Sequence, residues 1–216
     1  MSYNSFFIKV VFLGDSGSGK TSIICRIGDE PSDYLPFVYG SAVFQTKYDN
    51  VNMCPWDTPG SAEFERKRVL QYPHTNCVVL CFSISDRDSY NSCLNLWYPE
   101  ISLFLPKVPI ILVGTKSDHY NHPNYKKDHL ITHKEGLELA NKINAVEYIE
   151  TSSLNKTNIE KIKEVVLIVS ILNKNNKNNK DRDLSLLSPK KFKSTSSYSF
   201  KAPGDNDEKE SKCKIN

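Results

Sequence analysis

An eight-residue run near the amino terminus, Gly14-Asp-Ser-Gly-Ser-Gly-Lys-Thr21, constrains the fold of this chain more than any other segment. It has the pattern Gly-x4-Gly-Lys-Thr and directly follows the largely apolar run Ile8–Leu13, which is the context that a phosphate-binding loop requires. Glycines let backbone N–H groups curl around a polyphosphate, and the helix that follows presents its positive amino terminus. Lys20 can reach the β- and γ-phosphate oxygens, and Thr21 can bind the Mg²⁺ that neutralises them.

Strand and helix patterns alternate along the chain as far as residue 172. Apolar runs predict strands over residues 8–13, 43–48, 51–56, 77–84, 108–113 and 146–149. Helical spacing predicts helices over residues 20–27, 89–105, 133–142 and 158–172. This alternation predicts an α/β fold of the P-loop NTPase type, a three-layer sandwich whose mostly parallel sheet carries helices on both faces.

The composition changes at Asn173, where a polar, low-complexity segment rich in Asn, Lys, Ser and Asp begins. This segment has too little apolar surface to offset chain entropy, so we expect a folded domain over residues 1–172 and a disordered tail over 173–216. The tail carries a net charge of +5 against +3 for the whole chain, which leaves −2 on the domain. A basic tail attracts an anionic membrane surface or nucleic acid, or serves only as a solvated linker.

The chain shows no sign of secretion or membrane insertion in its sequence. No apolar stretch approaches the ~20 residues that span a bilayer, and the first residues lack the features of a signal peptide. The six cysteines form no Cys-x-x-Cys pair and lie mostly in apolar runs, as reduced core thiols do. We therefore expect a cytosolic protein without a metal-binding cysteine or histidine cluster.

Two further motifs follow predicted strands. In Trp56-Asp-Thr-Pro-Gly60, Asp57 can hold Mg²⁺ through a water ligand, and the Gly60 amide can approach a γ-phosphate. In Thr115-Lys-Ser-Asp118, the Asp118 carboxylate can accept two N–H groups from the guanine edge, while the Lys116 stem lies along the base. Each motif alone also fits an ordinary solvated turn. Their order after the phosphate loop favours a guanine-nucleotide site, which the polar turn Thr151–Leu154 completes.

The order of these motifs resembles that of the small GTPases, and several strings are similar to the Rho/Rac family in particular. These strings are Trp56-Asp57-Thr58, Gln71-Tyr-Pro-His-Thr75, Cys81-Phe-Ser83, Leu96-Trp-Tyr-Pro-Glu100 and Pro109-Ile-Ile-Leu-Val-Gly-Thr-Lys116. The resemblance covers about residues 6–170, with a shortened form of the family's helical insert after Asp118. It implies a GTP-binding switch that binds GTP or GDP with Mg²⁺.

The resemblance also implies a set of site residues. The metal is expected on Thr21 and Asp57. The nucleotide is expected on Gly14, Asp15, Ser16, Gly17, Ser18, Gly19, Lys20, Thr21, Ser22, Asp57, Thr58, Pro59, Gly60, Ser61, Thr115, Lys116, Ser117, Asp118, Ser152 and Ser153. No residue is assigned a catalytic role, because Ser61 occupies the position of the family's water-orienting Gln.

Other departures from the family pattern also bear on hydrolysis. Ser16 replaces a glycine, and its side chain crowds the γ-phosphate and the position where an activating protein would insert an arginine. Such an arginine raises the hydrolysis rate about 10³–10⁵-fold. Pro59 replaces a small residue and stiffens the loop. Ser16 and Ser61 together are similar to the Rnd subgroup, which binds GTP but hardly hydrolyses it. We therefore expect weak or absent hydrolysis.

The first switch departs furthest from the family. Phe37 stands where a threonine would close over Mg²⁺, and Glu30 stands where an aromatic residue would pack on guanine. Residues 38–42 also lack the family's acidic and tyrosine effector contacts. These changes fit either drift in a dispensable paralogue or a switch that is held in one state.

Cys213 lies four residues from the carboxyl terminus, at the position of a prenylated cysteine. Lys190, Lys191 and Lys193 supply the second, electrostatic signal that stable membrane anchoring needs. We therefore expect a lipid-anchored monomer on the cytoplasmic face of a membrane, otherwise cytosolic. It would bind effectors and regulators through its switch regions and would not bind nucleic acid.

Two functions remain open at this point. One is a Rho/Rac-type switch in signal transduction, by resemblance in cytoskeletal signalling, and the other is a pseudo-GTPase that acts as a nucleotide-independent scaffold. A nucleotide kinase is disfavoured, because the second and third motifs fit a GTPase better.

Overall fold

The computed structural model describes residues 6–28, 44–45 and 51–177 of the chain. Within these ranges a six-stranded sheet has the strand order β2-β3-β1-β4-β5-β6. Its strands are β1 (Phe6–Leu13), β2 (Phe44–Gln45), β3 (Val51–Asp57), β4 (Cys77–Ser83), β5 (Ile110–Thr115) and β6 (Glu147–Glu150). Strand β2 is antiparallel to β3 and the other neighbouring pairs are parallel, so the predicted sheet is confirmed.

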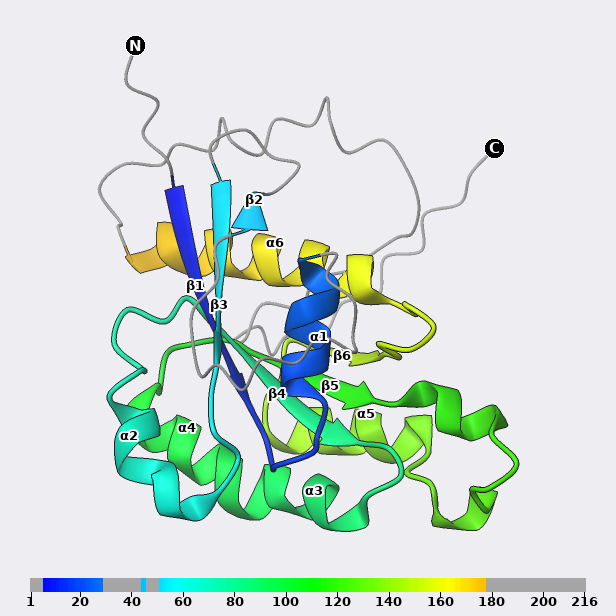
Figure 1. Cartoon of the computed structure of the whole chain (residues 1–216). Helices are drawn as coiled ribbons and strands as arrows, with labels where there is room; N and C mark the ends of the chain where they lie inside the picture. The colour runs from blue at the N-terminus through cyan, green and yellow to red at the C-terminus, as the bar shows by residue number, and fades with distance from the viewer. Residues whose placement is uncertain (1–5, 29–43, 46–50, 178–216) are drawn as a thin grey trace, which may run out of the picture. The chain divides into compact units, whose positions relative to one another are not determined.

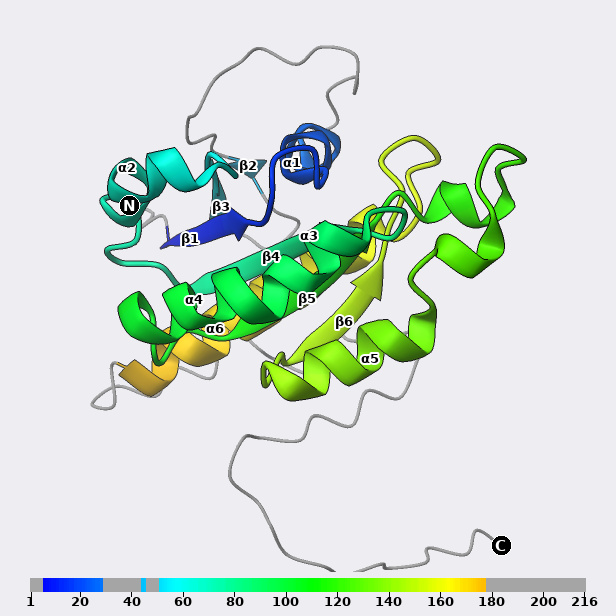
Figure 2. The same ribbon diagram turned by 90° about the horizontal axis from the view of Figure 1, so that it is seen from below.

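Helices cover both faces of this sheet (Figures 1 and 2). One face packs against α1 (Lys20–Ile27) and α6 (Ile159–Lys177). The other packs against α3 (Arg87–Ser92), α4 (Tyr98–Phe104) and α5 (His133–Lys142). A short helix, α2 (Glu65–Val69), follows a 3₁₀ turn, η1 (Ala62–Phe64), beside α4. The three-layer sandwich expected from the alternating pattern is therefore confirmed.

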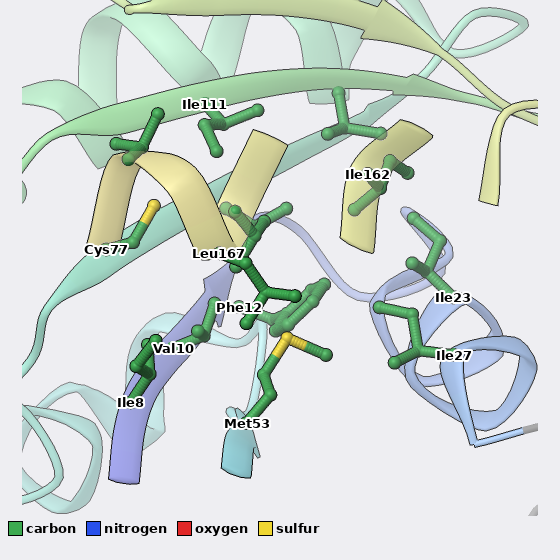
Figure 3. Close-up of a cluster of buried hydrophobic side chains, with 14 of the residues drawn as sticks. Ile8, Val10, Phe12, Ile23, Ile27, Met53, Cys77, Ile111, Ile162 and Leu167 are labelled. Carbon is green, nitrogen blue, oxygen red and sulfur yellow. The ribbon is translucent and has the colours of Figure 1, made fainter. Parts of the chain in front are cut away.

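The central strand β1 supplies both halves of the core. Its side chains alternate, so Ile8, Val10 and Phe12 pack under α1 and α6, while Val11 and Leu13 pack under the opposite helices. All five are fully buried, as is usual for a parallel strand covered on both faces. Figure 3 shows the first of these clusters, with Phe12 between Leu167 of α6 and Met53 of β3. The core thus fixes β1, at whose end the phosphate loop begins.

The helix predicted over residues 89–105 is interrupted by a wider turn. A π-helical turn, η2 (Cys93–Trp97), joins α3 to α4, and α4 has a proline in its first turn. Pro99 has no N–H, and its ring crowds the carbonyl four residues earlier, so the helix widens just before it. This turn carries Trp97, whose side chain is fully buried.

The last helix runs past the expected domain boundary. Helix α6 continues to Lys177, five residues beyond Leu172, and the Asn173 side-chain amide donates to the Asn76 carbonyl at 2.9 Å. Helix α6 therefore extends five residues into the segment that was expected to be disordered. Extending an existing helix costs little, because each added residue gains one backbone hydrogen bond. The rest of the expected tail lies outside the described residues.

Smaller differences also have local causes. Strand β5 begins at Ile110 rather than Val108, because the Val108 amide closes a turn onto the Leu105 carbonyl. Only Phe44 and Gln45 of the strand predicted over residues 43–48 are described.

Among the described helices, none combines the length and the apolar character that crossing a membrane requires.

Candidate nucleotide-binding site

The predicted motifs meet at one edge of the sheet. The phosphate loop follows β1, the Asp57–Ser61 segment begins at the end of β3, and the Thr115–Asp118 segment begins at the end of β5. The polar turn from Thr151 follows β6. These strands are parallel, so their carboxyl ends share one edge, where α/β proteins bind ligands.

The phosphate loop has the backbone conformation that its glycines allow. Gly14 has φ +134°, and a Cβ there would lie 2.1 Å from the Cys81 carbonyl oxygen. Lys20 folds back along the loop, and its Nζ donates to the carbonyls of Gly14 at 2.8 Å and Asp15 at 2.7 Å. Burial lowers the pKa of the Lys20 amine, because desolvation disfavours its charged form. An anionic ligand beside Lys20 would offset this cost.

The residues expected to hold Mg²⁺ are in contact. The Thr21 hydroxyl at the start of α1 donates to Asp57 Oδ2 at 2.6 Å. Oδ1 of Asp57 is buried and has no hydrogen-bond partner within the described part of the chain, and burial raises the pKa of this carboxyl group. A hydroxyl beside an unsatisfied carboxylate oxygen is a donor set that suits a hard divalent cation and its water ligands.

The Asp57–Gly60 segment lies directly against the phosphate loop. The Thr58 hydroxyl donates to the Phe12 carbonyl at 2.6 Å. A Cβ on Gly60 would lie 2.3 Å from the Ser16 backbone nitrogen, so only glycine fits this contact. Pro59 is held through its carbonyl, which accepts from Arg68 Nη1 at 3.0 Å. The segment is thus placed next to the loop that would hold the terminal phosphate.

The two serines that depart from the family pattern face different surroundings. Ser16 lies in the phosphate loop, and its side chain is exposed. Ser61 Oγ donates to Glu63 Oε1 at 2.9 Å, and its carbonyl accepts from Arg68 at 3.0 Å. The Ser61 hydroxyl is therefore engaged by its own loop.

The residues predicted to read guanine are also brought together. Asp118 Oδ1 accepts a hydrogen bond from the Ser152 hydroxyl at 2.6 Å, and the Ser117 amide donates to the Thr151 carbonyl. Lys116 adopts a left-handed backbone conformation with φ 60°. These contacts join the segment after β5, which carries both the carboxylate and the lysine stem, to the turn after β6.

Two hydrogen bonds connect the segments predicted to bind the base to the phosphate loop and the helix that follows it. The Thr115 hydroxyl donates to the Ser18 carbonyl at 2.7 Å, and Arg26 Nε of α1 donates to the Ser153 carbonyl at 2.8 Å. Among the remaining predicted positions, Gly17 and Gly19 have positive φ, and Ser22 lies half-buried in the first turn of α1.

A buried polar cluster supports the site and was not predicted. Arg68 of α2 makes two hydrogen bonds to the Glu100 carboxylate, at 2.9 and 2.7 Å, and the Tyr72 hydroxyl donates to the same carboxylate. The Arg68 guanidinium lies 4.6 Å from the centre of the Trp97 ring. Trp97 Nε1 in turn donates to Asp15 Oδ1 in the phosphate loop. Trp97 was predicted as core packing, which its burial confirms, but its polar contact has no signal in the sequence.

Several predicted features lie outside the described residues. These are Glu30, Phe37 and residues 38–42 of the first switch, and Cys213 with the lysines before it. Their roles stay predictions.

Comparison with known proteins identifies similar chains. A model of the Ras family matches residues 9–171. The Rho-related protein racN of Dictyostelium discoideum is 47% identical over 153 residues, which cover 68% of each chain. The Ras-like GTP-binding protein RhoL of Drosophila melanogaster is 37% identical, covering 69% of this chain and 79% of that one. The Rho-related protein racC of Entamoeba histolytica is also 37% identical, covering 71% and 84%.

Proposed function

Because the chain belongs to the Ras family and is a Rho/Rac-type small GTPase, a GTP-binding switch, we propose that it binds GTP and GDP with Mg²⁺ at the motifs described above and hydrolyses GTP slowly. The observation that carries this proposal is the contact of Thr21 with Asp57 beside the buried Lys20. It supports a site prepared for a metal–phosphate group, since the Lys20 amine and the Asp57 carboxylate are both buried and desolvated.

Each part of the site has a role in this proposal. Backbone amides of residues 14–21 bind phosphate oxygens, and Lys20 neutralises the β- and γ-phosphates. Thr21 and Asp57 hold Mg²⁺, which supplies charge neutralisation when it is bound. Asp118 accepts the guanine N–H groups, and the Ser152 hydroxyl keeps its carboxylate oriented. A guanine is preferred over an adenine, since adenine lacks the matching pair of donors.

Slow hydrolysis follows from what the second motif lacks. Phosphoryl transfer is catalysed almost entirely by positioning and charge stabilisation. The Ser61 hydroxyl is bonded to Glu63 and cannot reach an attacking water, and Ser16 adds a side chain beside the γ-phosphate position. We propose that the protein stays in its GTP-bound state longer than a family member that carries the usual glutamine.

The competing proposal is a nucleotide-independent scaffold. Phe37 and Glu30 favour it, because neither offers the contact that the family uses at its position. Isothermal titration calorimetry with GTPγS, GDP and ATP separates the two. The switch predicts micromolar or tighter binding of the guanine nucleotides alone, and the scaffold predicts no heat from any of the three.

A pair of lysine variants makes this test specific. Lys20→Ala should abolish guanine-nucleotide binding, because it removes the buried cation of the phosphate loop. Lys161→Ala is the matched control, since Lys161 lies in α6 and its amine pairs with Glu147 at 3.2 Å, away from the motifs. Unchanged binding by Lys20→Ala would overturn the switch.

Partners and location form a separate part of the proposal. We propose that effectors and regulators bind the switch regions of a monomer and that the output is cytoskeletal signalling. We also propose that prenylation of Cys213, with the lysines of the tail, attaches the protein to the cytoplasmic face of a membrane. Cells labelled with an isoprenoid analogue should show incorporation into the full chain and none into Cys213→Ser. A normal Rac serves as positive control, and an unlabelled full chain would overturn lipidation.

A further inference from the structure

The carboxylate that is proposed to read guanine has a histidine beside it. Asp118 Oδ1 accepts from the Ser152 hydroxyl at 2.6 Å, whereas Oδ2 lies 3.8 Å from His119 Nε2. Both residues belong to the 3₁₀ turn η3 (Ser117–Asn121). One carboxylate oxygen is thus fixed by a neutral hydroxyl, and the other faces a side chain that can gain a charge.

The His119 ring is held in this orientation by contacts on its other sides. Its Nδ1 lies 2.8 Å from the Ser85 hydroxyl in the loop after β4. The ring stacks on Tyr125, with 3.9 Å between ring centroids and 13° between planes. Only 15% of the side chain is exposed. When both ring nitrogens carry protons, Nδ1–H donates to Ser85, and Nε2 is the charged ring nitrogen that lies near the Asp118 carboxylate.

The groups around His119 shift the pKa of its ring. Burial lowers the pKa of His119, the Asp118 carboxylate raises it, and Lys116 and His122 lower it again. The His122 ring lies 6.3 Å from the His119 ring, centroid to centroid. Because the pKa of His119 lies below its ordinary 6.5, the ring is neutral at neutral pH and gains a proton only on acidification.

We propose that protonation of His119 weakens guanine-nucleotide binding by engaging the carboxylate oxygen of Asp118 that guanine requires. This inference rests on the proposed nucleotide-binding function and assigns its base site a pH dependence. The imidazolium competes with the guanine N–H donors for Oδ2 and neutralises part of the charge that attracts them. His119 is thus a positioning residue for the base, acting through Asp118.

Thermodynamic linkage gives the inference a second consequence. If a proton on His119 weakens nucleotide binding, bound nucleotide must weaken proton binding by the same factor. The pKa of His119 should therefore be lower in the GDP complex than in the nucleotide-free protein. A histidine that served only to pack against Tyr125 would not couple to the base in this way.

Dissociation of fluorescent mant-GDP from the full chain, measured from pH 5.5 to 7.5, tests the inference. As the pH falls from 7.5 to 5.5, the release rate of mant-GDP should rise at least about five-fold more in the unmodified protein than in His119→Gln. The glutamine side chain can still bond to Ser85 but does not titrate in this range. His129→Gln is the matched control, since His129 is exposed in the 3₁₀ turn η4 (Lys127–His129). The His129→Gln variant should keep the pH profile of the unmodified protein, including the pH dependence that comes from titration of the nucleotide phosphates.

The possible outcomes are distinguishable. An unchanged pH profile in His119→Gln would overturn the inference while leaving the proposed function intact, and failure of the unmodified protein to bind mant-GDP at pH 7.5 would overturn both. NMR titration of the His119 ring with and without GDP provides an independent readout. A lower pKa in the complex supports the inference, and an equal or higher pKa contradicts it.

Discussion

Trp97 Nε1 donates a hydrogen bond to Oδ1 of Asp15 across 2.6 Å, joining residues that are 82 positions apart. Trp97 belongs to the π-helical turn between α3 and α4, and Asp15 belongs to the phosphate loop. The carboxylate is thereby tied to the helical layer instead of facing the phosphates that the loop is proposed to bind. The Arg68 guanidinium lies over the same indole ring and also donates to the Pro59 carbonyl. The helical layer therefore holds both the phosphate loop and the segment after β3.

Replacing Trp97 with Phe should therefore disturb both stability and nucleotide retention. The change removes a hydrogen bond to a charged group, worth about 1.5–3 kcal/mol, and also leaves unfilled space in the core. Urea denaturation should show a loss of about 2–4 kcal/mol, and mant-GDP should dissociate faster. Tyr98→Phe removes only an exposed bond from Asn144 and should change stability by no more than about 0.5 kcal/mol. Equal effects of the two variants would contradict the proposed coupling.

Arg68 and Glu100 form a buried ion pair whose loss should be severe. Their side chains are 1% and 7% exposed, and breaking a buried pair from one side costs about 3–5 kcal/mol. Arg68→Met should lose that much in urea denaturation, while Arg68→Met combined with Glu100→Leu should recover part of it, because no charge is then left unpaired. Arg87→Met is the control, since its pair with Glu135 is 43% and 34% exposed and is worth about 0–1 kcal/mol. A double variant no more stable than Arg68→Met would contradict this account.

The motif residues could be predicted because their chemistry is local in the sequence. Lys20 and Thr21 follow one apolar run, and Asp57 closes another, so the parallel topology alone brings them to one edge. Strand β4 was predicted nearly to its ends, since a strand buried on both faces is a continuous apolar run. The layer architecture and the meeting of the three motifs at one edge of the sheet therefore followed from local pattern.

The support of the site could not be predicted in the same way. Arg68 lies in the run Glu65-Arg-Lys-Arg68, which has the composition of a solvated helix. Its burial depends on Glu100, thirty-two positions further on, and on the Trp97 ring. The π turn was missed for a related reason, because helical spacing does not register how Pro99 displaces a carbonyl one turn earlier.

Glu135 should give the domain an acid-sensitive contribution to stability. It accepts from the Thr132 amide and hydroxyl in the capping box of α5. Burial opposes ionisation, but these bonds and Arg87 outweigh it and lower the pKa of Glu135 from 4.5 to about 2. The stabilisation is therefore complete above pH about 4.5 and is lost as the pH falls towards about 2.

The matching measurement is urea denaturation of Glu135→Gln at pH 7 and at pH 3. After allowance for solvent screening at a partly exposed site, the variant should be about 1 kcal/mol less stable at pH 7. Its deficit should shrink at pH 3. Glu138→Gln is the control on the same helix, because Glu138 is 53% exposed and lies 4.0 Å from Lys134. A deficit that grows on acidification would show that the sign is wrong.

Thr21 should govern how strongly Mg²⁺ retains the nucleotide. Thr21→Ala removes the hydroxyl that contacts Asp57 and should weaken Mg²⁺ binding by about 10–100-fold. Chelation of Mg²⁺ should then accelerate mant-GDP release strongly in the unmodified protein and little in the variant. Ser102→Ala, an exposed change in α4, should respond like the unmodified protein. A variant that still responds fully to chelation would remove Thr21 from the metal site.

Restoring a long side chain at Ser61 should restore part of the missing hydrolysis. The Ser61 hydroxyl is bonded to Glu63, whereas its backbone is anchored by Arg68, so a Gln at this position would extend from a fixed point beside the phosphate loop. Single-turnover phosphate release should rise at least about ten-fold in Ser61→Gln, and further when Ser16→Gly is added, because that change clears space beside the γ-phosphate. Ser102→Gln controls for the added side chain. Release from the unmodified protein as fast as from an ordinary Rac would refute slow hydrolysis, and an unchanged rate in Ser61→Gln would mean that position 61 does not limit it.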